Sequence, residues 1–308
     1  MPYPIERKLV VAVASTALFD LTESDRIFQE QGPDVYRQHQ HEHEHEPLAE
    51  GTAFPFVRRL LSLNGEGPDG PVEVVLLSRN DPDTGLRVFN SIRHHKLDIS
   101  RGAFLKGKDP HTYMDAFNAS LLLSGNAANV RAAIAAGHAA GLVLGETFKD
   151  DLDDRELRVA FDFDAVLADD AAEAVFHTTN DLKAFHAAEV AQAAVPHRPG
   201  PLHRLFQSLA ALQRNGVDIP GIPAVRIAVI TARNAPSHER VVTTFREWNV
   251  QPDETFFLGG IEKARVLKAF RPHMFFDDQR SHLEGGSAYG AMVHVPFGIK
   301  NRDTGSPT

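Results

Sequence analysis

Two aspartates one residue apart, Asp162 and Asp164, follow directly on the apolar run 159–161. Alternate residues of a strand point to the same side, and ligands of an open α/β sheet bind just beyond the carboxyl ends of its strands. Two carboxylates at that place suit a hard cation such as Mg²⁺, which prefers oxygen ligands and keeps some of its waters. Because surface aspartates are common, the pair needs partners elsewhere in the chain before it indicates a site.

Three later segments supply such partners. Each lies at the end of an apolar strand pattern or after a glycine pair, and the residues are Thr231, Lys263, Asp277 and Asp278. In this order the residues resemble the four motifs of the haloacid dehalogenase-like phosphotransferases. The alternative is an ordinary Rossmann-like sheet with acidic strand ends, which explains one pair of aspartates much more easily than four motifs in order.

The motif resemblance implies a division of chemical work. Asp162 would attack phosphorus and form an aspartyl-phosphate, which splits a difficult hydrolysis into two steps. Asp164 would protonate the leaving oxygen and then activate the hydrolytic water. Phosphoryl oxygens would be held by a lysine acting as a point charge and by a strand-end segment. The residues of this phosphate-binding set are Thr231, Ala232, Arg233 and Lys263.

The same motifs imply a Mg²⁺ site. Its ligands would be oxygen atoms of the motif aspartates, namely Asp162, Asp164 through its main-chain carbonyl, Asp277 and Asp278. The metal would offset the repulsion between these carboxylates and an anionic substrate. The sequence does not decide which of Asp277 and Asp278 binds the metal directly.

Composition excludes several classes of function. The length of 308 residues favours two domains, and 43% hydrophobic with 24% charged residues is typical of soluble globular chains. A net charge of −9 argues against a nucleic-acid partner, which would need a basic face. The absence of cysteine excludes disulfides and thiol chemistry and fits the cytoplasm. We expect no signal peptide and no membrane span, because no apolar stretch has the required pattern and length.

Strand patterns alternate with helical segments along the chain, which predicts an α/β fold with a largely parallel sheet. An acidic stretch at 146–156 separates two halves and predicts a linker. We therefore expect a first domain over residues 1–150 and a catalytic domain over residues 151–308. The region between the first two catalytic motifs is long enough for a helical cap inserted at about 170–220.

The first half repeats the pattern of the second half without its chemistry. Aligned apolar segments place Ala14 and Thr16 where the second half has Asp162 and Asp164. The other motif positions are also replaced, and in the order given above their substitutes are Leu77, Pro110, Ser124 and Gly125. We infer two Rossmann-like domains from an internal duplication, of which the first is degenerate and catalytically silent.

The register of this repeat holds along much of the chain. Residues 104–125 align with residues 257–278 without a gap, and Pro47–Gly51 aligns with Pro196–Gly200. The alternative is that any two Rossmann-like halves share strand periodicity. An ungapped register of this length favours duplication over that alternative.

The whole chain resembles the cytosolic type I 5′-nucleotidases over nearly all of residues 8–300. The segments that carry this resemblance are residues 17–20, 30–32, 42–47, 53–57, 90–92, 157–167, 231–233, 271–273, 275–279 and 295–298. The resemblance implies Mg²⁺-dependent hydrolysis of nucleoside 5′-monophosphates, AMP among them. Phe163 departs from the family, which usually has glycine there, and residues 184–192 are poorer in charge than the family pattern. These two departures leave the nucleotide preference open.

Two other functions stay open. One is a phosphatase of the same superfamily that acts on another small phosphate ester. The other is a nucleotide-binding regulatory protein with little turnover, although the retention of all four motifs in the second half argues against it. The sequence does not decide the preferred base and sugar, the presence of a nucleotide effector, or whether the chain forms a homo-oligomer.

Several further residues have competing interpretations. Phe185 and His186 in the cap region are candidates for stacking on a base, although such residues more often belong to a core. Arg233 could pair with substrate phosphate. Arg79 holds the matching place in the silent half, so a structural role shared by both arginines is supported at least as well as phosphate binding. The histidine-rich run 39–46 alternates as the ligands of a strand-borne metal site would, yet its place in the repeat predicts a solvated helix face.

Overall fold

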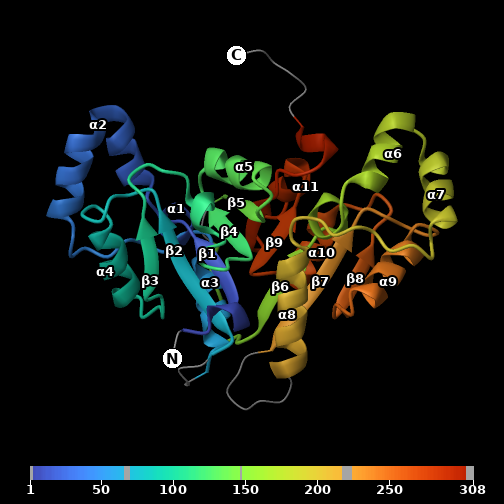
Figure 1. Ribbon diagram of the computed structural model, residues 1–308, viewed down its shortest axis with the longest axis horizontal. Coiled ribbons are helices and arrows are strands. Elements are labelled where there is room, and N and C mark those ends of the chain that lie inside the picture. Colours follow the sequence, from blue (N-terminus) through green and yellow to red (C-terminus); the bar gives the residue numbers. More distant parts are fainter. Residues whose placement is uncertain (1–2, 66–69, 146–147, 217–223, 303–308) are drawn as a thin grey trace. The chain divides into compact units, whose positions relative to one another are not determined.

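The computed structural model describes residues 3–65, 70–145, 148–216 and 224–302 (Figure 1). The chain divides into two compact units, Met1–Asp151 and Leu152–Thr308. We call them unit 1 and unit 2. Among the described residues, no helix is both long and apolar enough to cross a bilayer.

Unit 1 is built on parallel strands in the order β3-β2-β1-β4-β5. The strands are β1 (Leu9–Val13), β2 (Val72–Ser78), β3 (Arg101–Phe104), β4 (Leu121–Ser124) and β5 (Ala140–Leu144). The α-helices are α1 (Ser15–Leu18), α2 (Thr22–Glu42), α3 (Phe54–Ser62), α4 (Leu86–His94) and α5 (Ala127–Ala135). β1 and β2 are buried along their whole length, as valine- and leucine-rich strands covered on both faces are.

Unit 2 has parallel strands in the order β8-β7-β6-β9-β10. The strands are β6 (Leu157–Phe161), β7 (Val225–Thr231), β8 (Glu254–Phe257), β9 (Met274–Asp277) and β10 (Ala291–His294). The helical segments are η3 (Phe163–Leu167), α6 (Ala171–Thr179), α7 (Leu182–Ala191), α8 (His203–Gly216), α9 (His238–Glu247), α10 (Lys263–Phe270), α11 (Arg280–Glu284) and η4 (Ile299–Asn301). The predicted α/β fold with parallel strands is confirmed in both units.

The two units also share one topology. In each unit the first strand of the chain is central, the second and third strands follow on one side, and the fourth and fifth follow on the other. The sequence repeat aligns these strands in the same order from β1 with β6 to β4 with β9, and β5 and β10 are the next strands in their units. A common strand order is what an internal duplication leaves behind.

Finer features recur at matching places. Isolated bridges join Phe19 to Glu50 in unit 1 and Ala168 to Pro199 in unit 2. A glycine follows each bridge, and a Cβ atom on Gly51 would lie 2.7 Å from the Phe19 amide nitrogen. A Cβ atom on Gly200 would lie 2.2 Å from the Ala168 carbonyl oxygen. Only glycine allows the backbone to approach so closely, so both units depend on glycine at this point.

The helices between the first two strands match as well. In unit 1, α2 bends at Gly32, where φ is 84°, and so consists of two segments. In unit 2, α6 and α7 occupy the corresponding stretch and pack on each other, and Figure 1 shows them as a pair set apart from the strands. α8, which lies in the region expected as a cap, packs against β7 instead. Residues 217–220 at the end of that region lie outside the described residues.

Two stretches singled out in the sequence have defined contacts. Within the expected linker 146–156, residues 146–147 lie outside the described residues, while Asp150 is ion-paired with Arg59 at 2.7 Å and with Arg58. The histidine-rich run begins inside a helix, because α2 continues through Glu42. The start of this run is therefore helical, as its place in the repeat predicts.

Candidate active site

Asp162 lies at the carboxyl end of β6, where the chain enters the short helical turn η3. β6 pairs with β9 in parallel, with Phe161 opposite Phe276, so the residues after these two strands meet at one edge of the sheet. The Asp162 amide donates to the Phe276 carbonyl at 2.8 Å, and the Asp162 carboxylate accepts from the Phe163 amide at 2.7 Å. The side chain is fixed by these bonds, and only 4% of Asp162 is exposed.

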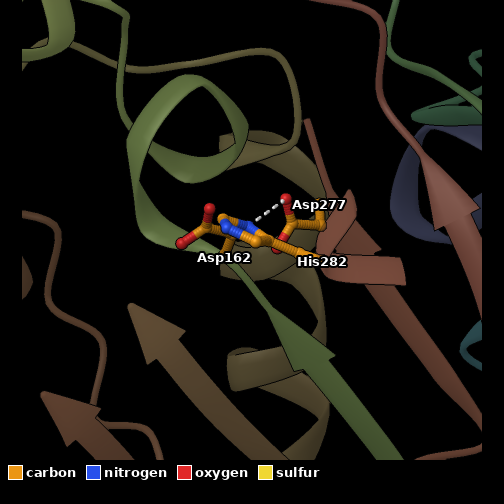
Figure 2. A group of neighbouring side chains, drawn as sticks. All are labelled: Asp162, Asp277 and His282. Atoms are coloured by element: carbon orange, nitrogen blue, oxygen red, sulfur yellow. Dashed lines mark hydrogen bonds and ion pairs between the residues drawn. The ribbon is translucent and has the colours of Figure 1, made fainter. Parts of the chain in front are cut away.

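Lys263 joins two carboxylates at this edge. It begins α10, and its Nζ lies 2.8 Å from Asp162 Oδ2 and 2.6 Å from Asp277 Oδ2. Asp277 ends β9, and Nδ1 of His282 in α11 lies 3.2 Å from each of its carboxylate oxygens. Figure 2 shows Asp162, Asp277 and His282 close to one another, and one ligand atom of each lies within 4.8 Å of the others.

Burial and the neighbouring charges together set the protonation of this cluster. It raises the pKa of Asp162 to about 7, although Lys263 opposes the shift and the Asp277 carboxylate adds to it. Burial lowers the pKa of Lys263, but Asp162 and Asp277 raise that pKa by more, so the amine stays charged. Burial also raises the pKa of Asp277, but Lys263 and His282 outweigh it and leave this pKa below its usual range. The cluster thus holds a charged lysine against an ionised Asp277.

The carboxylate of Asp278 has a different environment. Both of its oxygens are buried and have no hydrogen-bond partner among the described residues. Burial raises the pKa of Asp278 to about 9, and the carboxylates of Asp162 and Glu173 add to the effect. A buried carboxylate is costly unless it is paired or coordinates a metal, so this orphaned group fits a site built for a hard cation.

Asp164 makes another set of contacts. Arg233 binds it through two hydrogen bonds, from Nε to Oδ2 at 2.8 Å and from Nη2 to Oδ1 at 2.7 Å. A bidentate pair of this kind fixes orientation as well as adding energy. Burial raises the pKa of Asp164, but the Arg233 guanidinium outweighs burial and holds this pKa below its usual range. Asp164 is therefore ionised in this arrangement.

Arg233 also reaches a carboxylate of helix α7. Its Nη1 is ion-paired with Glu189 Oε2, and Glu189 Oε1 lies 2.8 Å from Nη1 of Arg240. His197 completes the group, with Nε2 3.2 Å from Glu189 Oε2. Burial raises the pKa of Glu189, but His197 and Arg233 outweigh it and hold this pKa at about 2. A buried network of charges thus runs from α7 through Arg233 to Asp164.

The remaining phosphate-binding candidates lie at the end of β7. Thr231 is buried, and its Oγ1 accepts from the Arg233 amide at 3.2 Å. Ala232 is exposed. The structure therefore brings Asp162, Lys263 and Asp277 into one cluster, while Arg233 belongs to the separate network around Asp164.

The two candidates for base stacking lie on α7. The Arg233 guanidinium lies over the Phe185 ring, 5.3 Å from its centroid. His186 Nδ1 lies 2.6 Å from the hydroxyl oxygen of Ser237. Both side chains are partly exposed, so each has an intramolecular partner and a face open to solvent.

Sequence patterns predicted no role for four residues of these two clusters, Glu189, His197, Arg240 and His282. A weak signal existed for Glu189, which is the single acid in segment 184–191, where the other residues except His186 are apolar. His282 follows Asp278 by four residues, one helical turn beyond a strand end. Such spacing could have placed His282 beside the acidic pair.

Comparison with known proteins follows the resemblance seen in the sequence. A family model described as 5′-nucleotidase matches residues 1–302. Human cytosolic 5′-nucleotidase 1B is 32% identical over 310 residues, which cover 97% of this chain and 51% of that protein. The chain therefore spans about half the length of this relative. No solved structure matched the chain at a significant level. The resemblance is confirmed, and the chain belongs to the 5′-nucleotidase family.

Proposed function

We propose that the chain hydrolyses nucleoside 5′-monophosphates to nucleoside and phosphate, with AMP among its substrates. The observation that carries this proposal is the cluster of Asp162, Lys263 and Asp277 at the ends of β6 and β9, in a member of the 5′-nucleotidase family. A fixed carboxylate beside a buried cation suits phosphoryl transfer through a covalent intermediate.

The residues at this edge fit a Mg²⁺ ion. The two buried oxygens of Asp278 have no hydrogen-bond partner among the described residues, whereas Asp277 is already engaged by Lys263 and His282. We therefore assign Asp278, Asp162 and the main-chain carbonyl of Asp164 as metal ligands, with Asp277 holding Lys263 in place. When bound, Mg²⁺ neutralises charge on the phosphoryl oxygens and orients the substrate.

The first step transfers the phosphoryl group to Asp162. An Asp162 oxygen bonds to phosphorus while the bond from phosphorus to the nucleoside 5′ oxygen breaks. Lys263 compensates charge on the phosphoryl oxygens. The leaving oxygen takes a proton from Asp164 and departs as the nucleoside hydroxyl.

The second step releases phosphate. Water attacks phosphorus, Asp164 takes the proton from that water, and the bond between phosphorus and Asp162 breaks. The ionised form that Arg233 maintains is the form of Asp164 required here. The first step requires a protonated Asp164, so we propose that substrate binding loosens the pair. Arg233 then positions Asp164 rather than binding phosphate itself.

Unit 1, in this proposal, hydrolyses no phosphate ester. Ala14 offers no nucleophile, and Thr16 has no proton donor of suitable pKa. Pro110 replaces the lysine, and Ser124 and Gly125 replace the acidic pair. The division of the chain is therefore a silent domain near residues 1–150 and a catalytic domain over the remainder.

A cytoplasmic location is part of the proposal. It is supported by the name of the human relative, a cytosolic enzyme, and by the absence of cysteine from the sequence. Cell fractionation with an antibody against the chain tests it, and recovery in a membrane or secreted fraction would contradict it.

The test of the function is phosphate release over a panel of nucleoside 5′-monophosphates and sugar phosphates, with Mg²⁺ and with a chelator. We expect kcat/KM to be highest for a nucleotide and turnover to require the metal. A higher kcat/KM for a sugar phosphate than for every nucleotide would indicate a phosphatase of another small ester. Binding of nucleotides without measurable release would indicate a regulatory protein.

A further inference from the structure

A cavity of about 1060 Å³ opens in unit 1. Its lining includes Ala14, Thr16 and Gly125, which stand at three of the catalytic positions of the repeat. Arg79, which matches Arg233, lines the same cavity. The silent unit thus has an open space at the place of the catalytic cluster, and the side chains around that space differ in charge from those of unit 2.

The partners of the matching arginines are the clearest difference. In unit 2, Arg233 is buried between the carboxylates of Asp164 and Glu189. Unit 1 has Thr16 and Gln40 at those two places. Gln40 is matched with Glu189 by the same alignment that places the bridge residues Phe19 and Glu50 on Ala168 and Pro199. The arginine of unit 1 has kept its charge, whereas both of the carboxylates that would compensate it are replaced by neutral residues.

Arg79 accordingly has a different environment. It is exposed, and its Nη1 donates to Oδ1 of Asn129, a neutral and buried residue, at 3.2 Å. Lys106 adds a second exposed positive charge to the lining. Ser124 and Gly125 stand in place of the acidic pair, so an anion here would not meet the repulsion of those two carboxylates. This part of the cavity suits a phosphate group, which arginine binds through several donors.

Acidic side chains also line the cavity, and their partners decide what they can bind. Asp81 is ion-paired with Arg37 at 3.2 Å. Asp20 accepts from a neighbouring threonine hydroxyl at 2.6 Å, and burial followed by the charge of Asp20 raises the pKa of Asp25. Asp20 and Asp25 are acceptors for neutral donors such as sugar hydroxyls. The lining therefore offers contacts to both an anion and a hydroxyl-bearing group.

An aromatic surface completes the lining. Phe28 is 50% exposed, and its ring packs edge-on against Tyr36 with centroids 5.6 Å apart. A half-exposed ring within a cavity has an open face on which a planar apolar group can pack. A cavity of about 1060 Å³ is also far larger than a free phosphate ion requires.

We infer that unit 1 binds a nucleoside 5′-phosphate in this cavity, with Arg79 as the phosphate contact and without metal or hydrolysis. The ligand leaves unchanged, because Ala14 cannot accept a phosphoryl group. This second site lies outside the proposed catalytic cluster, so the two proposals can fail independently.

The experiment uses the full chain with Asp162→Asn, in a chelator, so that bound nucleotide is not hydrolysed. Hydrogen–deuterium exchange is followed while AMP is titrated, in peptides covering residues 75–81 and 124–130 of unit 1. Peptides covering residues 157–167 report the catalytic unit separately. Inorganic phosphate is titrated in a parallel series, to separate recognition of the phosphate from recognition of the nucleoside.

Two substitutions at one position form the matched test. Thr16→Asp supplies the carboxylate that pairs with the arginine in unit 2, whereas Thr16→Asn has a similar shape without the charge. We expect AMP to protect the unit 1 peptides in the parent and in Thr16→Asn. Thr16→Asp should weaken the apparent affinity for AMP, read from this protection, by roughly 10- to 100-fold. That is the range for a lost charge-assisted hydrogen bond. Arg79→Gln should act like Thr16→Asp, and the exposed Arg131→Gln in the same unit should have no effect.

Three outcomes would overturn the inference. If AMP left the unit 1 peptides unprotected, unit 1 would have no nucleotide-binding site. If Thr16→Asp and Thr16→Asn weakened AMP binding equally and Arg79→Gln left it unchanged, Arg79 would not be the phosphate contact. Inorganic phosphate that protects as well as AMP at equal concentration would show that the cavity does not recognise the nucleoside.

Discussion

The two units share an apolar frame and differ in the polar groups that it carries. Both have the same strand order, and in both the central strand, β1 or β6, is almost entirely buried. Both also require a glycine beside the isolated bridge, Gly51 in one and Gly200 in the other. These shared features are backbone approaches and apolar contacts. The frame therefore does not depend on the groups that we propose to be catalytic, which only unit 2 carries.

The difference is concentrated around one conserved feature of the repeat, the arginine after the second strand. In unit 2 the arginine is buried with two carboxylates and a histidine, His197, beside them. In unit 1 the histidine position is Leu48, a buried apolar residue, and Arg79 is exposed. A buried charge is tolerated where its partners are buried with it. The exposure of Arg79 therefore follows from the loss of its charged partners, because without them a buried arginine would be costly.

The largest expected effect concerns the nucleophile. Asp162→Asn should lower kcat by roughly 10⁴- to 10⁶-fold, as removal of a catalytic nucleophile commonly does, because an amide cannot form the acyl phosphate. Phosphate release from AMP under saturating Mg²⁺ measures it. Adding Ala14→Asp to this variant should restore nothing, since unit 1 also lacks the lysine and the acidic pair. Near-normal turnover by Asp162→Asn, or rescue by Ala14→Asp, would contradict the assignment of the chemistry to unit 2.

The next effect concerns the acid and base. Asp164→Asn should lower kcat by roughly 10²- to 10⁴-fold, the usual contribution of a positioned proton donor. KM should change much less, because Asp164 acts on the leaving oxygen in the transition state and does not hold the substrate in the ground state. Steady-state kinetics separate the two constants. A large rise in KM with kcat unchanged would instead favour a role for the Asp164 and Arg233 pair in substrate binding.

The fold and the main cluster were predictable because both follow from local patterns. Apolar runs that alternate with helical segments require a sheet, and the ends of parallel strands meet at one edge. Asp162 and Asp277 therefore had to be neighbours once their strands were paired. The extent of the cap was less predictable, because α8 has an apolar face that packs against β7 and its sequence does not say which surface that face covers.

The network around Arg233 was not predictable in the same way. Glu189 reaches Arg233 because α7 is packed at a particular place on unit 2, and no strand register fixes that position. The sequence offered only the match of Arg233 with Arg79, which left phosphate binding and a structural role equally open. Side-chain geometry was needed to show that both carboxylates are already engaged by the arginine.

The smallest effect in this series is on stability. Glu189→Gln should lower the free energy of unfolding by about 3–5 kcal/mol at neutral pH, because removing one partner of a buried ion pair leaves the others uncompensated. The matched change in unit 1 is Gln40→Met, which removes a hydrogen bond to the Ser24 hydroxyl at 2.9 Å. That neutral bond is worth only about 1 kcal/mol. Denaturant unfolding of both variants against the parent gives the comparison.

The pH dependence distinguishes a lost charge from lost packing. The pKa of Glu189 in the folded chain is about 2, against an ordinary value of 4.5. Because the folded pKa is depressed, this stabilisation is fully present above the ordinary pKa and is lost as pH falls toward the folded one. The stability gap between the parent and Glu189→Gln should therefore be constant from about pH 7 to about pH 5 and narrow below that. The difference in unfolding free energy between the parent and Gln40→Met should not vary with pH, since neither glutamine nor methionine titrates. A gap for Glu189→Gln that stayed constant down to about pH 3 would mean that Glu189 acts through packing alone, and charge compensation would no longer explain why Arg233 is buried and Arg79 is not.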